Sequence, residues 1–280
     1  MIEVVAERLR EAAREAVMPR FRRLAREEVE EKSPGELVTI VDREVEALLS
    51  PMLAALRPGS RVVGEEAAAL TPALLDDLGT GDVWLVDPLD GTANFAGGDP
   101  CFSLMVAWLR DGETLASWMY SPATGRMHVA ERGGGAFRDG ARITCGNEPA
   151  PLAALRGSVL TRFLPDAMKE QVASGAPSLG AVLPGLKCAG EEYPAIALGR
   201  QHFAMFWRTL PWDHAPGALY LQEAGGVVAR LDGRRYLPAE TGSGLLAARS
   251  ATEWDMLRET LVGSAVRRVG AAGGQGRRSP

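Results

Sequence analysis

Residues 84–95, WLVDPLDGTANF, decide how this chain folds. Residues 83–86 form an apolar run, which is typical of a buried strand. The run stops at Asp87, and Asp90 follows shortly after it. Pro88 fixes its own φ and keeps the preceding residue extended, which allows the two acids to converge on one point. The sequence therefore predicts two carboxyl groups at the C-terminal end of a strand.

Converging carboxyl groups without a local Lys or Arg indicate a metal site. They repel one another, which raises their pKa values and destabilises the site unless a cation fills it. Gly91 and Thr92 follow where the chain must turn, and the exposed N–H groups of such a turn suit a phosphate. The pattern Asp-Pro-x-Asp-Gly is also typical of an ordinary turn, so this stretch alone leaves a plain loop as an alternative.

Length and composition are those of a globular chain. The 280 residues are 46% hydrophobic and 24% charged, enough for one large domain or two closely packed ones. No apolar stretch suggests a membrane span, and the N-terminal segment MIEVVAERLREAAREAV mixes acids with arginines, unlike a secretory signal or transit peptide. A net charge of -5 gives no electrostatic footprint for nucleic acid. We therefore expect a cytoplasmic protein.

The cysteines support a reducing compartment. Cys101, Cys145 and Cys188 are scattered, lack metal-ligand spacing and are odd in number. We interpret all three as small core residues and expect no disulfide framework.

Three further acids stand where an apolar run or a glycine gives way to a helical pattern. Asp42 follows the apolar segment 37–41, Glu65 follows Gly64, and Asp213 precedes a helical pattern. Each also has a purely structural interpretation, because Asp42 and Asp213 suit helix N-caps and Glu65 suits a solvated helix start. Ligands of α/β folds bind at such places, so the acids are candidates for one shared site.

The periodicity predicts helices and strands in two parts. Helices are expected at 2–24 with an interruption at Pro19, and at 45–56, 165–173, 191–198, 218–224 and 251–262, and a connecting helix and loop at 71–80. Strands are expected at 37–41, 61–63, 83–86, 103–109, 114–120, 126–131, 136–138, 157–160, 202–206, 226–230 and 244–247. We expect an N-terminal α+β subdomain at 1–150, a C-terminal α/β subdomain at 151–263 and a disordered, basic tail at 264–280.

Four motifs, taken together, resemble the inositol monophosphatase family of lithium-sensitive, magnesium-dependent phosphatases. They are Lys32 with LVTIVD up to Asp42, the Gly-Glu-Glu of 64–66, DPLDGTANF at 87–95, and WDHAPG from Trp212. The resemblance covers roughly residues 1–262. The four motifs in this order favour function over the structural interpretations of the single acids.

The resemblance implies an α/β fold, the layered αβαβα sandwich of that family, with metals at the junction of its sheets. It implies one Mg²⁺ held by Glu65, Asp87 and the carbonyl of Leu89. A second ion is implied at Asp87, Asp90 and Asp213, and a third, loosely held, near Glu65. All-oxygen ligation is what Mg²⁺ prefers, and it requires neither His nor Cys.

The same resemblance implies hydrolysis of a small-molecule phosphate monoester by a metal-activated water. Thr92 and Asp42 are implied to orient and deprotonate that water, while Glu65 orders the metal-bound waters. The amides of Gly91 and Thr92 are implied to receive the phosphate oxygens, with Asp213 also at the substrate.

Departures from the family pattern leave the substrate open. Glu36 replaces a more usual Asp, Phe206 stands where inositol-specific members carry a Glu that contacts a ring hydroxyl, and residues 187–190 lack the usual small lining. Without that glutamate, discrimination for inositol is expected to be poor. We keep inositol 1-phosphate as the nominal substrate, with histidinol phosphate as the nearest alternative. The 3'(2')-phosphoadenosine phosphates and fructose 1,6-bisphosphate follow.

Some neighbouring residues and a non-enzymatic role also need weighing. His214 follows Asp213 directly, but we favour packing over a role as general acid, as we do for Trp212. The family implies a homodimer, and a module that binds protein or RNA partners through the basic tail is an alternative function. The intact set of acids favours catalysis, because a binding role gives no reason for them to converge.

Overall fold

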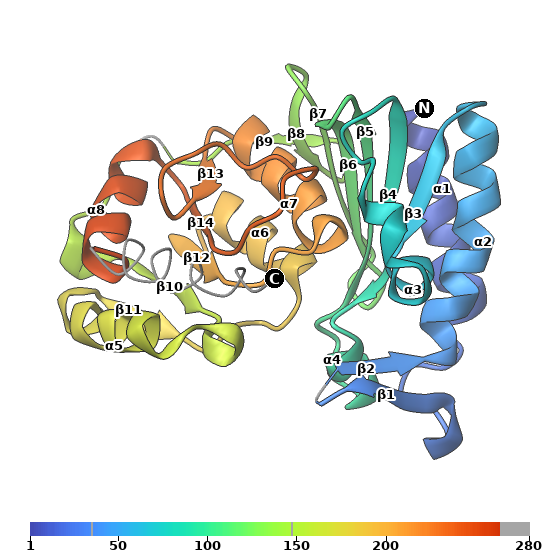
Figure 1. Ribbon diagram of the computed structural model, residues 1–280, viewed down its shortest axis with the longest axis horizontal. Helices are drawn as coiled ribbons and strands as arrows, with labels where there is room; N and C mark the ends of the chain where they lie inside the picture. The colour runs from blue at the N-terminus through green and yellow to red at the C-terminus, as the bar shows by residue number, and fades with distance from the viewer. Residues whose placement is uncertain (35, 147, 264–280) are drawn as a thin grey trace, which may run out of the picture.

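The computed structural model describes residues 1–34, 36–146 and 148–263, and the tail expected at 264–280 lies outside them (Figure 1). The helices are α1 (Ile2–Ala12), continued by a π-helical turn (Ala13–Val17), α2 (Ile40–Leu56), α3 (Glu65–Leu70), α4 (Thr92–Ala96), α5 (Asp166–Gly175), α6 (Ala189–Ala197), α7 (Pro211–Glu223) and α8 (Ala251–Leu261). The first strands are β1 (Val29–Ser33), β2 (Glu36–Thr39), β3 (Arg61–Gly64), β4 (Asp82–Asp90), β5 (Ser103–Arg110), β6 (Glu113–Ser121) and β7 (Arg126–Glu131). The others are β8 (Gly135–Arg138), β9 (Ala141–Ile143), β10 (Arg156–Val159), β11 (Ala181–Leu183), β12 (Phe203–Phe206), β13 (Val227–Arg230) and β14 (Leu245–Ala248).

The strands form two large sheets and one hairpin. The seven-stranded sheet has the order β3-β4-β5-β6-β7-β8-β9, and only its first pair is parallel. The five-stranded sheet has the order β11-β10-β12-β14-β13. In that sheet β10 runs parallel to both of its neighbours, whereas β14 is antiparallel to β12 and β13. The predicted antiparallel meander is confirmed, and β1 and β2 pair as a separate hairpin.

The elements stack in five layers with hydrophobic clusters between them. Helices α1 and α2 cover one face of the seven-stranded sheet, α6 and α7 fill the space between the sheets, and α5 and α8 cover the outer face of the other sheet (Figure 1). The outer helices α1, α2, α5 and α8 are buried on the side that meets a sheet, whereas α6 and α7, between the sheets, are buried at nearly every position. The predicted αβαβα sandwich is therefore confirmed.

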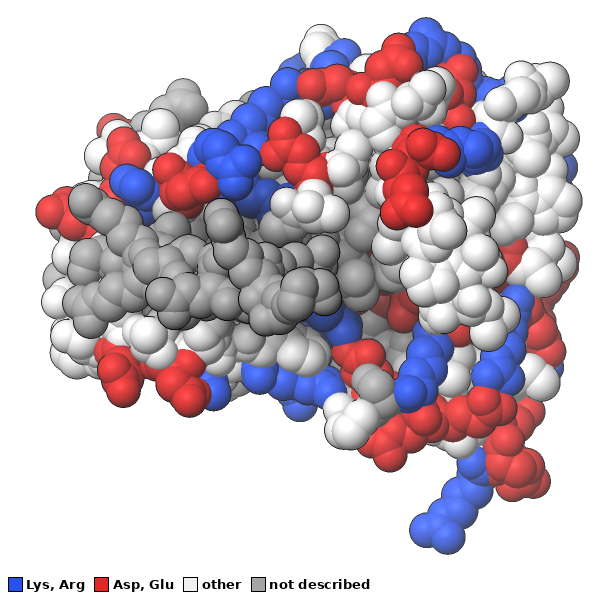
Figure 2. All heavy atoms as spheres, viewed as in Figure 1, with Lys and Arg blue, Asp and Glu red and all other residues white. Residues whose placement is uncertain are grey.

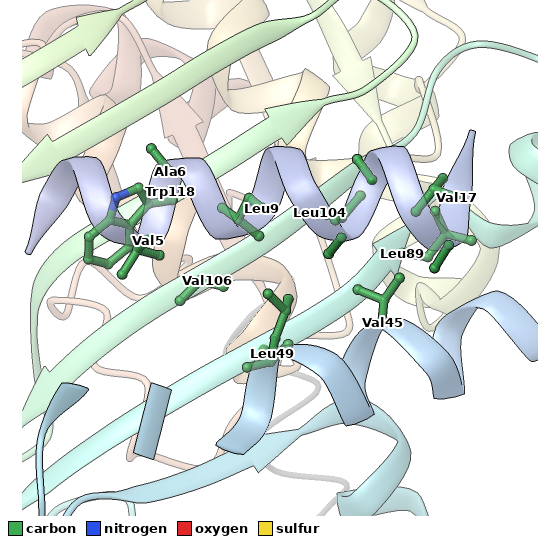
Figure 3. Close-up of a cluster of buried hydrophobic side chains, with 14 of the residues drawn as sticks. Val5, Ala6, Leu9, Val17, Val45, Leu49, Leu89, Leu104, Val106 and Trp118 are labelled. Atoms are coloured by element: carbon green, nitrogen blue, oxygen red, sulfur yellow. The ribbon is translucent and has the colours of Figure 1, made fainter. Parts of the chain in front are cut away.

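The hydrophobic core between helices α1 and α2 and the seven-stranded sheet accounts for the helical spacing of apolar residues near the N-terminus. Leu9 of α1 and Leu49 of α2 point toward Val106 of β5, and Trp118 of β6 covers the start of α1 (Figure 3). The Trp118 ring nitrogen donates to the carbonyl of Ile2 at 3.0 Å, which fixes where α1 begins on the sheet. These two helices thereby support the sheet that carries the predicted acids.

Several predicted boundaries were wrong. The first helical segment ends at Val17, and Phe21 and Leu24 pack against the core from the chain beyond it. The helix expected at 71–80 is only a 3₁₀ turn at Pro72–Leu75. Strands β1, β9 and β11 were missed, because short edge strands with mixed polarity lack a clear period. Helix α7 begins at Pro211 rather than at residue 218, since proline suits the first turn of a helix.

Two other predictions concern a membrane span and the boundary between the two parts of the chain. No helix in the described part of the chain has the length and apolar character that a membrane span needs. The boundary proposed near residue 150 falls between β9, the last strand of the first sheet, and β10, the first strand of the second.

Gly217 should be intolerant of any side chain. A Cβ atom there would lie 2.0 Å from Cδ2 of the buried Tyr193, so the close packing of α7 on α6 requires glycine. We expect Gly217→Ala to lower the free energy of unfolding by about 1–3 kcal/mol. Gly79→Ala is the control, because its nearest new neighbour is 3.8 Å away. Equal urea midpoints for the two variants would contradict this packing.

Candidate metal and phosphate site

The parallel pairing of β3 with β4 brings two of the predicted acids together. Gly64 pairs with Val86, so Glu65 and Asp87, the next residues, meet at the same edge of the sheet. The predicted end of β4 at residue 86 was wrong, because pairing with β5 resumes at Asp90 after an irregularity. Pro88 lies in this irregularity, where its missing N–H costs no ladder bond.

The turn after β4 is closed by its own side chains. Asp87 Oδ1 accepts from the Leu89 amide at 3.0 Å, and the Thr92 hydroxyl lies 2.8 Å from the Leu89 carbonyl oxygen. Gly91 has a φ of 85°, and a Cβ atom there would lie 2.8 Å from the carbonyl oxygen of Cys101. Only glycine fits this position without strain.

Asp42 lies one turn inside α2, so its interpretation as an N-cap was wrong. Thr39 is the N-cap, and Asp42 Oδ2 accepts from the Thr39 amide at 2.8 Å and from its hydroxyl at 2.6 Å. Asp42 Oδ1 lies 3.0 Å from the Thr92 hydroxyl. This arrangement is a capping box that also connects α2 to the turn after β4.

Asp213 is not an N-cap either. Helix α7 begins at Pro211 with Leu210 at the cap, so Asp213 lies in the first turn and faces the other acids. Its carboxyl group lies close enough to those of Asp87 and Asp90 to interact with both.

Burial and mutual repulsion shift every acid of this group in the same direction. Burial raises the pKa of Asp42 to about 6 and the pKa of Asp90 to about 7. Burial, followed by the charge of Asp213, raises the pKa of Glu65 to about 8. Burial, followed by the charge of Asp90, raises the pKa of Asp213 to about 7. The pKa of Asp87 lies well above its usual range because of burial and then the charge of Glu65.

The structure therefore brings together all five predicted acids. Lys32 is the nearby amine, 3.4 Å from Glu65 and bonded also to Glu66. In the described part of the chain, no three His, Cys, Asp or Glu side chains are already spaced as a finished metal cage. The donor set is nevertheless all oxygen and electrostatically coupled, which fits a hard divalent cation.

The C-terminal half also reaches this site. The Gly190 amide donates to Asp90 Oδ2 at 2.7 Å, and Cys188 lies against the backbone of Asp90. The segment 187–190, which departs from the family pattern, thus contacts the acids directly. Glu192, just after it, is fully buried and accepts from the Ser158 hydroxyl at 3.0 Å, so it is a structural residue.

The predicted packing roles of His214 and Trp212 agree with the structure. His214 Nδ1 lies 2.9 Å from the Tyr193 hydroxyl, and its Nε2 lies 3.0 Å from the carbonyl oxygen of Arg208. Burial lowers the pKa of His214 to about 4, so it is neutral at pH 7. Trp212 is buried within a hydrophobic core.

Sequence reasoning missed Arg208 and Glu46. The positive charge of Arg208 acts on Asp213, and its side chain forms an ion pair with Glu36. Glu46 accepts from the amides of Glu66 and Ala67 at 2.8 and 2.9 Å, which holds the start of α3 beside the site. The only available signal was helical spacing from Asp42 to Glu46 on one face of α2.

The comparisons with known proteins agree on one family. The inositol monophosphatase family matches residues 1–267. The chain belongs to the inositol monophosphatase family, and it is a phosphatase, a phosphoric monoester hydrolase. Members of this family are generally metal-dependent.

Individual relatives are about a third identical to this chain over the aligned residues. An inositol-1-monophosphatase of Mesorhizobium japonicum is 33% identical over 72% of this chain and 75% of its own length. A fructose-1,6-bisphosphatase/inositol-1-monophosphatase of Thermotoga maritima is 31% identical over 73% of this chain and 76% of its own. A solved IMPase structure from Thermotoga maritima, at 24% identity, has a TM-score of 0.79 and covers 96% of this chain and 98% of its own. That likeness supports the fold.

The raised pKa values predict how stability depends on pH. Without metal, the folded chain holds protons that the unfolded chain, with carboxyl pKa values near 4, has released. Stability therefore falls as pH rises from about 4 to about 8, the range between the unfolded and folded pKa values. In EDTA we expect the melting temperature to drop by roughly 5 °C between pH 5.5 and 8.5.

Added Mg²⁺ should raise the melting temperature more at the higher pH, because it binds the ionised acids. Asp213→Asn is the matched variant, since it removes one titrating group and should flatten the pH dependence in EDTA. A metal-free melting temperature that stays constant or rises over this range would contradict the proposed repulsion.

Proposed function

We propose that this protein hydrolyses small-molecule phosphate monoesters with two or three Mg²⁺ ions bound at the acid cluster. The ligands are the carboxyl groups of Glu65, Asp87, Asp90 and Asp213 and the carbonyl oxygen of Leu89. The observation that supports this proposal is the convergence of buried and half-buried acids from different elements, whose pKa values are all raised. An all-oxygen set of this kind suits Mg²⁺.

Bound Mg²⁺ supplies an acidified water and charge stabilisation for the transferred phosphate. The chain itself supplies the route for the proton. The Thr92 hydroxyl lies between the Leu89 carbonyl and Asp42, at 2.8 and 3.0 Å, so it can accept from a water and donate to Asp42. Asp42 is 1% exposed, and a pKa of about 6 suits a base that works near neutral pH.

The remaining residues bind and orient. Glu65 has one partner in Lys32 and is free to order water on its other side. We propose that the amides of Gly91 and Thr92, at the start of α4, receive the phosphate oxygens. We also propose that Asp213, in the first turn of α7, contacts the substrate.

The identity of the alcohol half of the substrate is a separate question. Phe206 is 3% exposed and stacks on Tyr193 at a centroid distance of 5.4 Å, so its ring belongs to the core. It offers no hydrogen bond to a sugar hydroxyl. Inositol 1-phosphate remains the nominal substrate, and the bifunctional relative from Thermotoga maritima adds support for fructose 1,6-bisphosphate beside histidinol phosphate and phosphoadenosine phosphates.

We also propose three properties of the family for this protein. They are a homodimeric state, inhibition by lithium and a cytoplasmic location. Size-exclusion chromatography and a lithium titration of phosphate release check the first two.

Asp90→Asn tests the metal site. Loss of this ligand should reduce Mg²⁺-dependent phosphate release by about 100-fold or more, while the fold remains intact. Asp82→Asn is the matched control, because Asp82 begins the same strand and pairs with Arg110 at 3.0 Å, away from the acid cluster. Phosphate release from the four named substrate types, with and without Mg²⁺, is the measurement.

Equal activity of Asp90→Asn and Asp82→Asn would contradict the assignment of Asp90. Wild type that releases no phosphate from any of these compounds would favour the partner-binding alternative over the proposed phosphatase.

A further inference from the structure

The short loop between β12 and α7 holds Arg208 in a fixed position beside the acid cluster. Because the Arg208 carbonyl can only accept, His214 Nε2 carries the proton and donates to it at 3.0 Å. His214 Nδ1 then accepts from the buried Tyr193 hydroxyl at 2.9 Å. Phe206 packs edge-on against His214 at 4.7 Å. This buried cluster, through the bond from His214 to the Arg208 carbonyl, holds the backbone of Arg208 in place.

The Arg208 side chain, in contrast, is open to solvent. It is 40% exposed, pairs with Glu36 of β2 and lies over the ring of Phe163, with its guanidinium carbon 4.6 Å from the ring centroid. Acidic and basic side chains mix on the face that includes the border between the two halves of the molecule (Figure 2). Because the Arg208 side chain is 40% exposed and paired with Glu36, its guanidinium lies at the surface and is oriented toward a carboxylate.

Arg208 is also close enough to influence the site. Its partner Glu36 lies on β2, whose hairpin partner β1 carries Lys32, and the Lys32 amine lies 3.4 Å from Glu65 Oε1. Asp213 lies in the first turn of the helix that this loop precedes. The Arg208 guanidinium therefore lies where the loop before α7 meets the β1–β2 hairpin, next to two elements that carry residues of the site.

We propose that Arg208 is a specificity-determining residue that binds a second anionic group of the substrate, a phosphate or a carboxylate, in exchange for Glu36. This inference rests on the phosphatase function proposed above. A half-exposed ion pair is weak, so Glu36 can be displaced by an anionic group that the bound substrate holds beside Arg208. Guanidinium groups bind phosphate and carboxylate through paired hydrogen bonds, which makes Arg the suitable residue for this task.

The test compares substrates that differ by one anionic group. The pairs are fructose 1-phosphate with fructose 1,6-bisphosphate, and glycerol 3-phosphate with 3-phosphoglycerate. KM and kcat are measured with Mg²⁺ for wild type and for Arg208→Ala, Arg208→Lys and Glu36→Gln. Arg126→Ala is the control. Arg126, at the start of β7, is also an exposed arginine (58% accessible), and it pairs with Asp139 in the turn between β8 and β9.

Arg208→Ala should raise KM for the substrate with two anionic groups on the order of tenfold, with kcat nearly unchanged. Its KM for the substrate with one group should stay constant, and Arg208→Lys should restore part of the loss. Glu36→Gln should lower KM for the doubly anionic substrate, because it removes the competitor for Arg208. A response confined to the fructose phosphates identifies the second group as a phosphate, and a response confined to the glycerol and glycerate phosphates identifies it as a carboxylate.

A purely structural ion pair gives a different result. In that case Arg208→Ala and Glu36→Gln change KM in the same direction for every substrate, and the proposal is overturned. Calorimetric binding of the same compounds in Mg²⁺ separates this failure from failure of the phosphatase proposal. Binding that prefers the doubly anionic compound and depends on Arg208 supports the inference even without turnover, whereas binding without that preference contradicts it.

Discussion

Repulsion among buried carboxyl groups is the constraint on which the rest of this structure depends. Asp87 is 2% exposed, and its charge meets those of Glu65, Asp90 and Asp213. Such a group is costly to bury when ionised, and it persists only if protons or a cation compensate it. The surrounding layers hold these groups together against that cost, which is why the site lies on strands and helix starts rather than on a free loop.

The fold provides this support from both halves of the chain. Parallel pairing of β3 with β4 places Glu65 beside Asp87, and the bulge after Asp87 aims Asp90 at the same region. Helix α7, packed between the two sheets, brings Asp213 from the distant C-terminal half. A glycine at 217 allows that helix to approach α6 closely enough. The hydrophobic packing of these layers thus fixes the geometry of groups that repel one another.

The sequence allowed the family, the layered fold and the five acids to be predicted, because each acid stands in a motif at the end of an apolar run. It did not predict which residues begin the helices. Thr39 competes with Asp42 for the N-cap of α2, and Pro211 begins α7 two residues before Asp213, with Leu210 at the cap; only the folded chain shows this. The role of Arg208 was also hidden, because its partner Glu36 is distant in sequence and meets it only through the folding of both halves.

The most direct test of the account is the number of protons released when Mg²⁺ binds at pH 7. Calorimetric titration of the metal-free protein in buffers of different ionisation enthalpy measures this number. Because Glu65, Asp90 and Asp213 have pKa values of about 7 to 8 without metal, Mg²⁺ should expel about one proton or more, and Asp90→Asn should expel fewer. Binding of Mg²⁺ without proton release, or with release unchanged in Asp90→Asn, would contradict the central claim that repelling carboxyl groups form the metal site.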